Sequence, residues 1–219
     1  MIKKISLMGL ELDDYSFPEA IKIIESFLTD TALSVVLAVD MERLLNAGED
    51  PDVREVLSTA DYTVVTDKAI PEAVSAGGTI RMSEVEDGAF LEGFLNHMYR
   101  EDRTFYLVGT SEHTTAQMRE TLRKSFSYIR IVGESVISPD LEDAESCVNA
   151  INILVPDVIL SSLDTPQEEC FLKKYRTQIC ARIWYGGGKD LMMEEQGFSL
   201  IRWFRRIRMR EAFRSRMHQ

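Results

Sequence analysis

The chain has 219 residues, 45% of them hydrophobic, and a formal net charge of −11 at pH 7. This length and hydrophobic content fit one α/β domain with a sizeable core and a short tail better than two domains. The negative charge argues against nonspecific nucleic-acid binding by the body of the protein. The three cysteines form no CxxC pair and have no histidine at ligand spacing, which argues against disulfides and a zinc site and favours a reducing, cytoplasmic location.

The charge is unevenly distributed. Residues 202–219 contain seven arginines and one acid, a net charge of +6, so the rest of the chain carries −17. Aromatic residues such as Trp203 and Phe204 lie between these arginines, a mixture typical of a helix on an anionic membrane surface. We therefore expect a domain over 1–196 and a basic amphipathic appendage over 197–219. Packing of the appendage on the acidic body is an alternative, and nucleic-acid binding is a third that the acidic body disfavours.

Apolar periodicity and turn residues predict strands that alternate with helices. The expected strands are 2–10, 33–39, 62–66, 104–108, 129–133, 158–162 and 179–185. The first helix follows the capping box Ser16-Phe-Pro-Glu19, and the later helices are expected at 41–47, 51–59, 69–77, 86–100, 112–126, 141–154 and 166–177. This alternation predicts a Rossmann-like α/β fold, with a mostly parallel sheet, helices on both faces and right-handed crossovers. No run reaches transmembrane length, and the N-terminus is too polar for a signal peptide.

Asp67 directly follows the expected strand 62–66. A carboxylate at the exit of a buried strand lies where open α/β sheets bind their ligands, and desolvation there can make it a general base. The alternative is a structural role, in which Asp67 caps a helix that begins near Ala69.

Three further turns follow the expected strands 104–108, 158–162 and 179–185. If all strands are parallel, these turns and Asp67 share one edge of the sheet, where they would form a binding cleft. Each turn is also compatible with an ordinary connection. The small, flexible or polar residues in them are Gly109, Thr110, Glu168, Glu169, Gly187, Gly188 and Asp190.

Several short runs follow one another in an order that resembles one known family. They are Ala38-Val-Asp-Met-Glu-Arg-Leu44, Asp50-Pro-Asp-Val-Arg-Glu-Val-Leu57 with Ala60-Asp61, Thr66-Asp67, Arg81-Met-Ser83, Phe105-Tyr-Leu-Val-Gly109, Ile131-Val-Gly133, Leu163-Asp-Thr-Pro-Gln-Glu-Glu-Cys-Phe171 and Gly187-Gly-Lys-Asp190. In order and spacing they resemble the WecG/TagA/CpsF glycosyltransferases, glycosyltransferase family 26, from about Gly9 to the tail.

The resemblance implies a metal-independent, inverting transferase that moves an N-acetylhexosamine-type sugar from a UDP-sugar to a polyprenol-linked acceptor. Such an enzyme would act in cell-surface polysaccharide synthesis, peripherally at the inner face of the cell membrane, and needs no cofactor besides its donor substrate. Asp67 would be the general base, and family members often form homo-oligomers. Donor-binding residues carried over by motif are Asp40, Lys68, Arg81, Gly109, Thr110, Glu168, Glu169, Gly187, Gly188 and Asp190, and tail residues for the diphosphate or the membrane are Arg202, Arg205, Arg206 and Arg208.

The sequence departs from the family pattern at several of these positions. Ala38 and Asp40 replace a threonine and an asparagine, Lys68 replaces a glycine, and Glu168 replaces a glutamine. These replacements motivate an alternative function. In that alternative, the chain is a catalytically degenerate relative that binds a nucleotide sugar or a partner transferase as a scaffold or regulator.

Overall fold

A computed structural model describes residues 4–67, 70 and 89–191, with only the backbone of residues 89, 189 and 190. Lys68, Arg81, the basic tail and the expected helix at 69–77, except for Ile70, lie outside the described residues. Within the described part, the fold contains a six-stranded parallel sheet and seven α-helices, which confirms the predicted α/β class.

The main sheet has the strand order β4-β3-β8-β7-β5-β6, and every pair of neighbours is parallel. Its strands are β3 (Ser34–Val39), β4 (Tyr62–Val65), β5 (Thr104–Gly109), β6 (Arg130–Val136), β7 (Val158–Ser161) and β8 (Ile183–Gly186). The central strands β3, β7 and β8 are buried along their whole length, as expected for continuously apolar strands that are covered on both faces.

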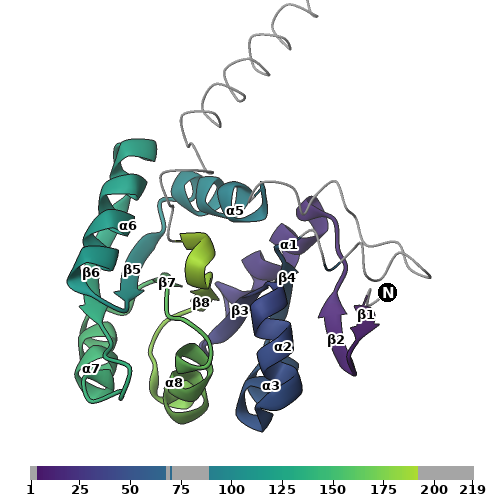
Figure 1. Ribbon diagram of the computed structural model, residues 1–219. Helices are drawn as coiled ribbons and strands as arrows, with labels where there is room; N and C mark the ends of the chain where they lie inside the picture. Colours follow the sequence, from purple (N-terminus) through teal and green to yellow (C-terminus); the bar gives the residue numbers. More distant parts are fainter. Residues whose placement is uncertain (1–3, 68–69, 71–88, 192–219) are drawn as a thin grey trace, which may run out of the picture.

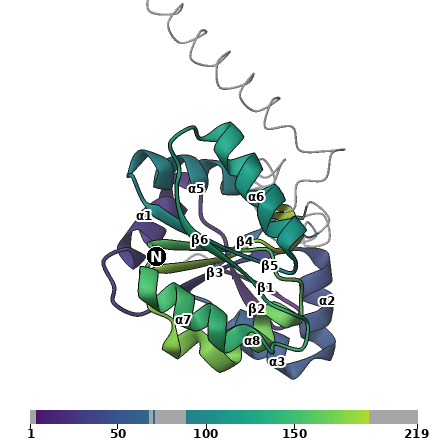
Figure 2. The same ribbon diagram turned by 90° about the vertical axis from the view of Figure 1, so that its left-hand side faces the viewer.

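Two groups of helices cover the two faces of the sheet (Figures 1 and 2). One group packs with the core around Trp184 and consists of α2 (Met41–Glu49), α3 (Pro51–Ser58), α7 (Ala144–Leu154) and α8 (Gln167–Tyr175). The other packs with the core around Tyr185 and consists of α1 (Phe17–Phe27), α5 (Ala89–Arg100) and α6 (Glu112–Ser125). Connections that lead toward the β4 edge use the first group, and those toward β6 use the second, as a uniform crossover hand requires.

The N-terminal segment differs from the prediction of one strand over 2–10. Met8 and Gly9 both have positive φ angles, 52° and 73°, and the turn that they form divides the segment into β1 (Lys4–Leu7) and β2 (Leu10–Asp13). Two left-handed residues are what a tight antiparallel hairpin requires. The hairpin is a separate two-stranded sheet, and Arg54 Nη2 donates to the carbonyls of Met8 and Gly9 at 3.1 Å each.

The hairpin lies along the outer edge of β4. Asp13 N donates to Thr63 Oγ1 at 2.8 Å, and Thr63 N donates back to Asp13 Oδ2 at 3.0 Å. The side chains of Asp13 and Thr63 each accept the backbone amide of the other residue. These two hydrogen bonds join the hairpin to the main sheet in place of a continuous strand pairing.

The structure confirms the predicted capping box at the start of α1 but not the predicted end of the following helix. The capping box is present, since Ser16 N donates to Glu19 Oε2 at 3.0 Å. The predicted end of the second helix at Ala47 is wrong, because α2 continues to Glu49. Asp50 follows and caps α3 by accepting the amide of Asp52. No helix in the described ranges is long and apolar enough to cross a membrane.

Candidate active site

The parallel register brings the ends of four strands to one level of the sheet. Leu37 of β3 pairs with Gly186 of β8, Gly186 pairs with Ser161 of β7, and Ser161 pairs with Val108 of β5. The segments that follow these strands therefore leave from the same edge, as predicted. In open α/β proteins this edge is the place of ligand binding.

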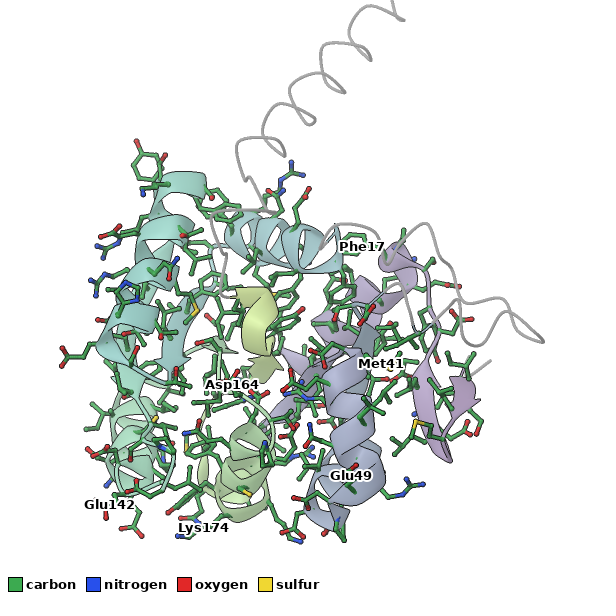
Figure 3. All side chains as sticks on the ribbon, viewed as in Figure 1. Phe17, Met41, Glu49, Glu142, Asp164 and Lys174 are labelled. Atoms are coloured by element: carbon green, nitrogen blue, oxygen red, sulfur yellow. The ribbon has the colours of Figure 1, made fainter. Side chains whose placement is uncertain are left out.

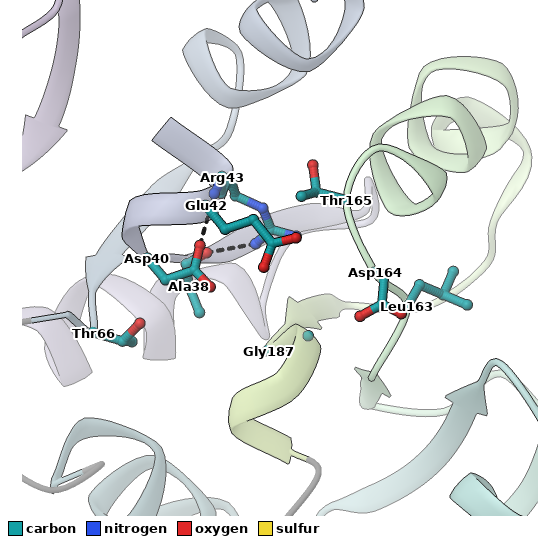
Figure 4. Close-up of a pocket in the computed structure, with 10 residues that line it drawn as sticks. Ala38, Asp40, Glu42, Arg43, Thr66, Leu163, Asp164, Thr165 and Gly187 are labelled. Atoms are coloured by element: carbon teal, nitrogen blue, oxygen red, sulfur yellow. Dashed lines mark hydrogen bonds between the residues drawn. The ribbon is translucent and has the colours of Figure 1, made fainter. Parts of the chain in front are cut away.

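A pocket opens at this edge, between the ends of β3, β4, β7 and β8 (Figure 4). Asp40 and Thr66 stand on one side of it, Asp164 and Leu163 on the opposite side, and Gly187 lies between them. The complete lining is Ala38, Asp40, Glu42, Arg43, Thr66, Leu163, Asp164, Thr165, Gly187 and Gly188. Of the ten predicted binding residues other than the base, the pocket thus contains Asp40, Gly187 and Gly188.

Asp40 has a structural role at the start of α2. Its Oδ1 accepts the backbone amide of Arg43 at 2.8 Å, which satisfies one of the unpaired amides of the first turn. The same turn carries Glu42, which is exposed, and Arg43, which is only 4% exposed. Figure 3 shows that Met41, at the start of α2, and Asp164, before α8, lie at one end of these helices, whereas Glu49 and Lys174 lie toward the opposite end.

The guanidinium of Arg43 lies between two strand ends and two carboxylates. Its Nη1 donates to the carbonyl of Ala38 at 2.5 Å and to that of Gly186 at 3.4 Å. Its Nη2 donates to Glu168 Oε2 at 2.5 Å, and its Nε lies 2.8 Å from Glu169 Oε1. We call these three charged side chains, Arg43, Glu168 and Glu169, the buried ion cluster.

The two glutamates, which are predicted to bind the donor, are not among the residues that line the described pocket. Both are 0% exposed. Glu168 Oε1 accepts the indole N–H of Trp184 at 2.9 Å, and Glu169 Oε2 accepts the hydroxyl of Thr165 at 2.9 Å. The reason for the difference is Arg43, a cation that draws both carboxylates into the interior. Contact with a ligand would pass through Thr165 and Arg43, which do line the pocket.

Burial and mutual charge set the protonation of the cluster. Burial alone would lower the pKa of Arg43, but the facing Glu168 and Glu169 carboxylates raise it above its ordinary value, so the guanidinium stays charged. Burial raises the pKa of Glu168, against the lowering effect of Arg43, and the neighbouring Glu169 raises it further. Two buried carboxylates thus share one cation.

The glycine turn after β8 fits against this cluster. A Cβ atom on Gly186 would lie 2.5–2.7 Å from the carboxylate of Glu168, so any larger residue would collide with it. Gly187 N donates to the carbonyl of Ser161 at 3.0 Å, and Gly188 has a φ of +48°, a conformation that favours glycine. Asp190 lies in the 3₁₀ helix η3 (Gly188–Leu191) that follows.

Asp67 lies beside the pocket, directly after Thr66, which lines it. Thr66 N donates to the carbonyl of Val39 at 3.0 Å and so continues the pairing of β4 with β3. Asp67 is half-buried, and its carbonyl accepts the amide of Ile70 at 3.2 Å. Its role as a general base stays a prediction.

Gly109 and Thr110 share the edge of the sheet but not the lining of the pocket. Gly109 ends β5, on the far side of β7 from β8, and a Cβ there would lie 2.7 Å from Thr115 Cγ2. The close approach of α6 therefore explains this glycine without a ligand. A contact of either residue with a nucleotide remains a prediction.

Sequence reasoning missed Arg43 as a site residue. A signal for it was present, because Arg43 lies four residues before Ala47, on the apolar face of α2. Glu168 likewise shares the apolar face of α8 with Leu172 and Tyr175, at the spacing i, i+4, i+7. A charge on such a face indicates a buried ionic partner.

No three His, Cys, Asp or Glu side chains among the described residues are grouped so that they could hold a metal ion. Metal-independent chemistry remains an expectation from the family resemblance. The described pocket offers carboxylates at Asp40, Glu42 and Asp164, hydroxyls at Thr66 and Thr165, and one guanidinium.

A parallel α/β sheet with a polar pocket beyond its strand ends defines the broad class of α/β proteins that bind small polar ligands. Within this class, the chain belongs to the Glycosyl transferase WecG/TagA/CpsF family, which its sequence matches over residues 5–214. The family resemblance of the motif order is thereby confirmed.

One similar protein is the N-acetylglucosaminyldiphosphoundecaprenol N-acetyl-beta-D-mannosaminyltransferase of Bacillus spizizenii. The two sequences are 21% identical over 151 residues, which are 69% of this chain. The matched region spans 58% of the length of that relative.

Proposed function

We propose that the protein transfers an N-acetylhexosamine-type sugar from a UDP-sugar to a polyprenol-linked acceptor, with inversion at the anomeric carbon. Family membership supports glycosyl transfer, and the name of the Bacillus spizizenii relative supports the sugar and lipid classes. The observation that carries the proposal is the pocket at the strand ends, where carboxylates and hydroxyls that can bind sugar hydroxyls gather beside Asp67.

In the proposed reaction, Asp67 takes the proton of the acceptor hydroxyl. The acceptor oxygen then forms a bond to the anomeric carbon as the bond from that carbon to the diphosphate oxygen breaks. UDP leaves with the electron pair, and Asp67 holds the proton. A single displacement of this kind needs one base on the side of the acceptor and stabilisation of charge on the side of the leaving group.

The leaving diphosphate needs cations. Arg43 is the only cation among the described side chains that line the pocket, and its guanidinium is occupied by Glu168 and Glu169. The proposal therefore assigns the diphosphate to Lys68, Arg81 and the tail residues Arg202, Arg205, Arg206 and Arg208, since arginine binds phosphate oxygens in a bidentate manner.

The proposal extends to the environment of the enzyme. The arginine-rich and aromatic composition of 202–219 supports contact with an anionic membrane surface, where a polyprenol-linked acceptor is located. Gly187 and Gly188 allow the backbone to approach the donor, with Gly109, Thr110 and Asp190 near the nucleotide. Assembly into a homo-oligomer belongs to the same proposal and rests on the family resemblance alone.

A second candidate, the degenerate relative that binds without turnover, is favoured by two of the positions that depart from the family pattern. The pocket carries Ala38 where the family has threonine, and Glu168, in place of the family glutamine, is engaged with Arg43 below the surface. This candidate predicts binding of UDP without cleavage or transfer of a UDP-sugar.

A thermal-shift measurement with UDP and a panel of UDP-sugars tests the donor pocket first. A ligand that binds only the folded state raises the Tm by mass action, so we expect a rise with UDP and a larger one with the correct UDP-sugar. No shift at millimolar ligand would contradict the transferase and would favour a degenerate relative that binds a partner transferase.

The substitution Asp67→Asn tests the catalytic base in a transfer assay with a UDP-N-acetylhexosamine and a short polyprenyl-diphosphate-sugar acceptor. We expect the rate to fall by about 10²–10⁴-fold, because the amide keeps the shape but cannot accept the proton. The matched control is Asp102→Asn, since Asp102 lies before the amino end of β5. Its φ of 53° is a conformation that asparagine adopts readily. Turnover by the Asp67→Asn variant at the wild-type rate would show that Asp67 is not the catalytic base. If neither the wild-type protein nor the variant transfers sugar, the degenerate relative is favoured.

A further inference from the structure

The buried ion cluster touches three separate walls of the pocket. The first wall is the end of β3 and the start of α2, where Arg43 Nη1 donates to the carbonyl of Ala38 at 2.5 Å. The backbone of the same arginine is fixed by the side chain of Asp40, which accepts its amide at 2.8 Å. Both Ala38 and Asp40 line the pocket.

The second wall is the turn between β7 and α8. Thr165 lines the pocket, and its hydroxyl donates to Glu169 Oε2 at 2.9 Å. The other oxygen of Glu169 lies 2.8 Å from Arg43 Nε. The amide of Glu168 donates to the carbonyl of Asp164 at 3.0 Å, so the first turn of α8 fixes the backbone of the lining residues.

The third wall is the glycine turn after β8. Glu168 packs directly against Gly186, which accepts a long hydrogen bond from Arg43 Nη1 at 3.4 Å. The opposite oxygen of Glu168 accepts from Trp184, two residues earlier in the same strand. Gly187, the next residue, lines the pocket.

We propose that Arg43 is a positioning residue, which sets the three walls of the pocket relative to one another through Glu168 and Glu169. A guanidinium presents five donors in a rigid, planar fork, so one side chain can serve two carbonyls and two carboxylates at once. A buried ion cluster adds little stability relative to well-packed apolar side chains of the same volume, and in some proteins it instead specifies one conformation. The role of this cluster is therefore to define the shape of the donor pocket, and its kinetic consequence rests on the proposed function.

The variant Arg43→Lys separates charge from shape, because lysine keeps the cation and loses the fork. The matched control is Arg176→Lys, since Arg176 also donates to a carbonyl, that of Thr59 at 2.9 Å, and to a carboxylate, that of Asp61 at 2.6 Å, but is remote from the pocket lining. Amide hydrogen exchange of the full chain is measured for the turns 163–169 and 186–188.

We expect Arg43→Lys to accelerate exchange by about tenfold or more in both turns, whereas Arg176→Lys leaves them at the wild-type rate. If Arg43→Lys does not fold, the double variant Arg43→Met/Glu168→Gln, which keeps one buried carboxylate, is measured in the same way. Wild-type exchange in both turns of the folded variant would overturn the inference.

Kinetics provide a second readout that a merely structural role would not move. We expect Arg43→Lys to raise the KM for the UDP-sugar by about tenfold, which is about 1.4 kcal/mol. The kcat should change less than about threefold, because Asp67 follows β4, whereas the hydrogen bonds and ion pairs given above for Arg43 reach β3, β8 and α8. An unchanged KM would also overturn the inference. If the wild-type enzyme transfers no sugar, only the proposed function fails, and hydrogen exchange still decides the role of Arg43.

Discussion

Helix α8 carries two ionic clusters with the same charges in opposite surroundings. Near its start, Arg43 meets Glu168 and Glu169, whose side chains are 0% exposed. Near its end, Lys173 Nζ lies 2.7 Å from both Asp52 and Glu55, at exposed fractions of 41% to 59%. Each cluster joins α8 to the α2–α3 pair with one cation and two carboxylates.

The comparison of the two clusters shows that burial, rather than contact distance, determines how strongly the loss of an ionic contact affects stability. The distances are similar, yet water screens the Lys173 cluster and is excluded from the Arg43 cluster. In the exposed cluster, the hydrogen bonds to Asp52 and Glu55 raise the pKa of Lys173, and each partner remains solvated. In the buried cluster, loss of one partner would leave a charge without solvent.

The largest effect is expected for Arg43→Met, which leaves the two buried carboxylates of Glu168 and Glu169 without the cation that they share. We expect the free energy of unfolding to fall by about 3–5 kcal/mol, measured by urea denaturation. Adding Glu168→Gln should recover part of the loss, because a single buried carboxylate then remains. A double variant as unstable as the single one would show that charge is not the cause.

The next effect is expected for Gly186→Ala, which intrudes on the carboxylate of Glu168. We expect a loss of about 1–3 kcal/mol, since Glu168 is fixed by Arg43 and Trp184 and cannot move aside without breaking these contacts. Gly48→Ala is the matched control: it lies in α2 and meets only the flexible end of Met8 at 3.3 Å. There alanine should stabilise by about 0.5–1 kcal/mol, and equal effects at both sites would contradict the packing argument.

A smaller effect of opposite sign is expected for Glu168→Gln. Because the pKa of Glu168 is raised in the folded state, its contribution to stability is present at low pH and is lost as the pH rises through that pKa. The neutral amide avoids this loss. We expect the Tm to rise by about 2–4 °C at pH 7.5, and this advantage to shrink toward pH 5. A constant Tm difference across this range would exclude the titration of Glu168 as its cause.

The smallest effect is expected for Lys173→Met, in the exposed cluster. We expect the Tm to change by no more than about 2 °C at low salt, with no change at 1 M NaCl, because salt screens exposed pairs. A loss as large as that of Arg43→Met would remove the contrast between the two clusters.

Much of the fold was predictable because its signals are local. The apolar run that became β3, the capping box of α1 and the strand-to-helix alternation each depend on neighbouring residues. The parallel arrangement then required the strand ends, with Asp40, Thr66 and Gly187 near them, to meet at one edge. The hairpin at Met8–Gly9 escaped prediction, because a glycine in a short apolar run does not by itself distinguish a turn from a strand.

The chemistry of the site was less predictable because its decisive contact is distant in sequence. Arg43 and Glu168 are separated by 125 positions, and each alone is compatible with a solvated helix face. Only their places on the apolar faces of two helices indicate burial, and neither place names the partner. The sequence therefore did not predict that Glu168 is buried and contacts Arg43 and Trp184.

The contact between Asp13 and Thr63 also has a consequence for self-association. An outer strand with unpaired amides can recruit a strand from another molecule and begin a fibril. At the β4 edge, the amide of Thr63 already donates to a carboxylate, and that carboxylate places negative charge beside the strand. The hairpin thereby protects this edge against aggregation, with two residues that lie 50 positions apart in the sequence.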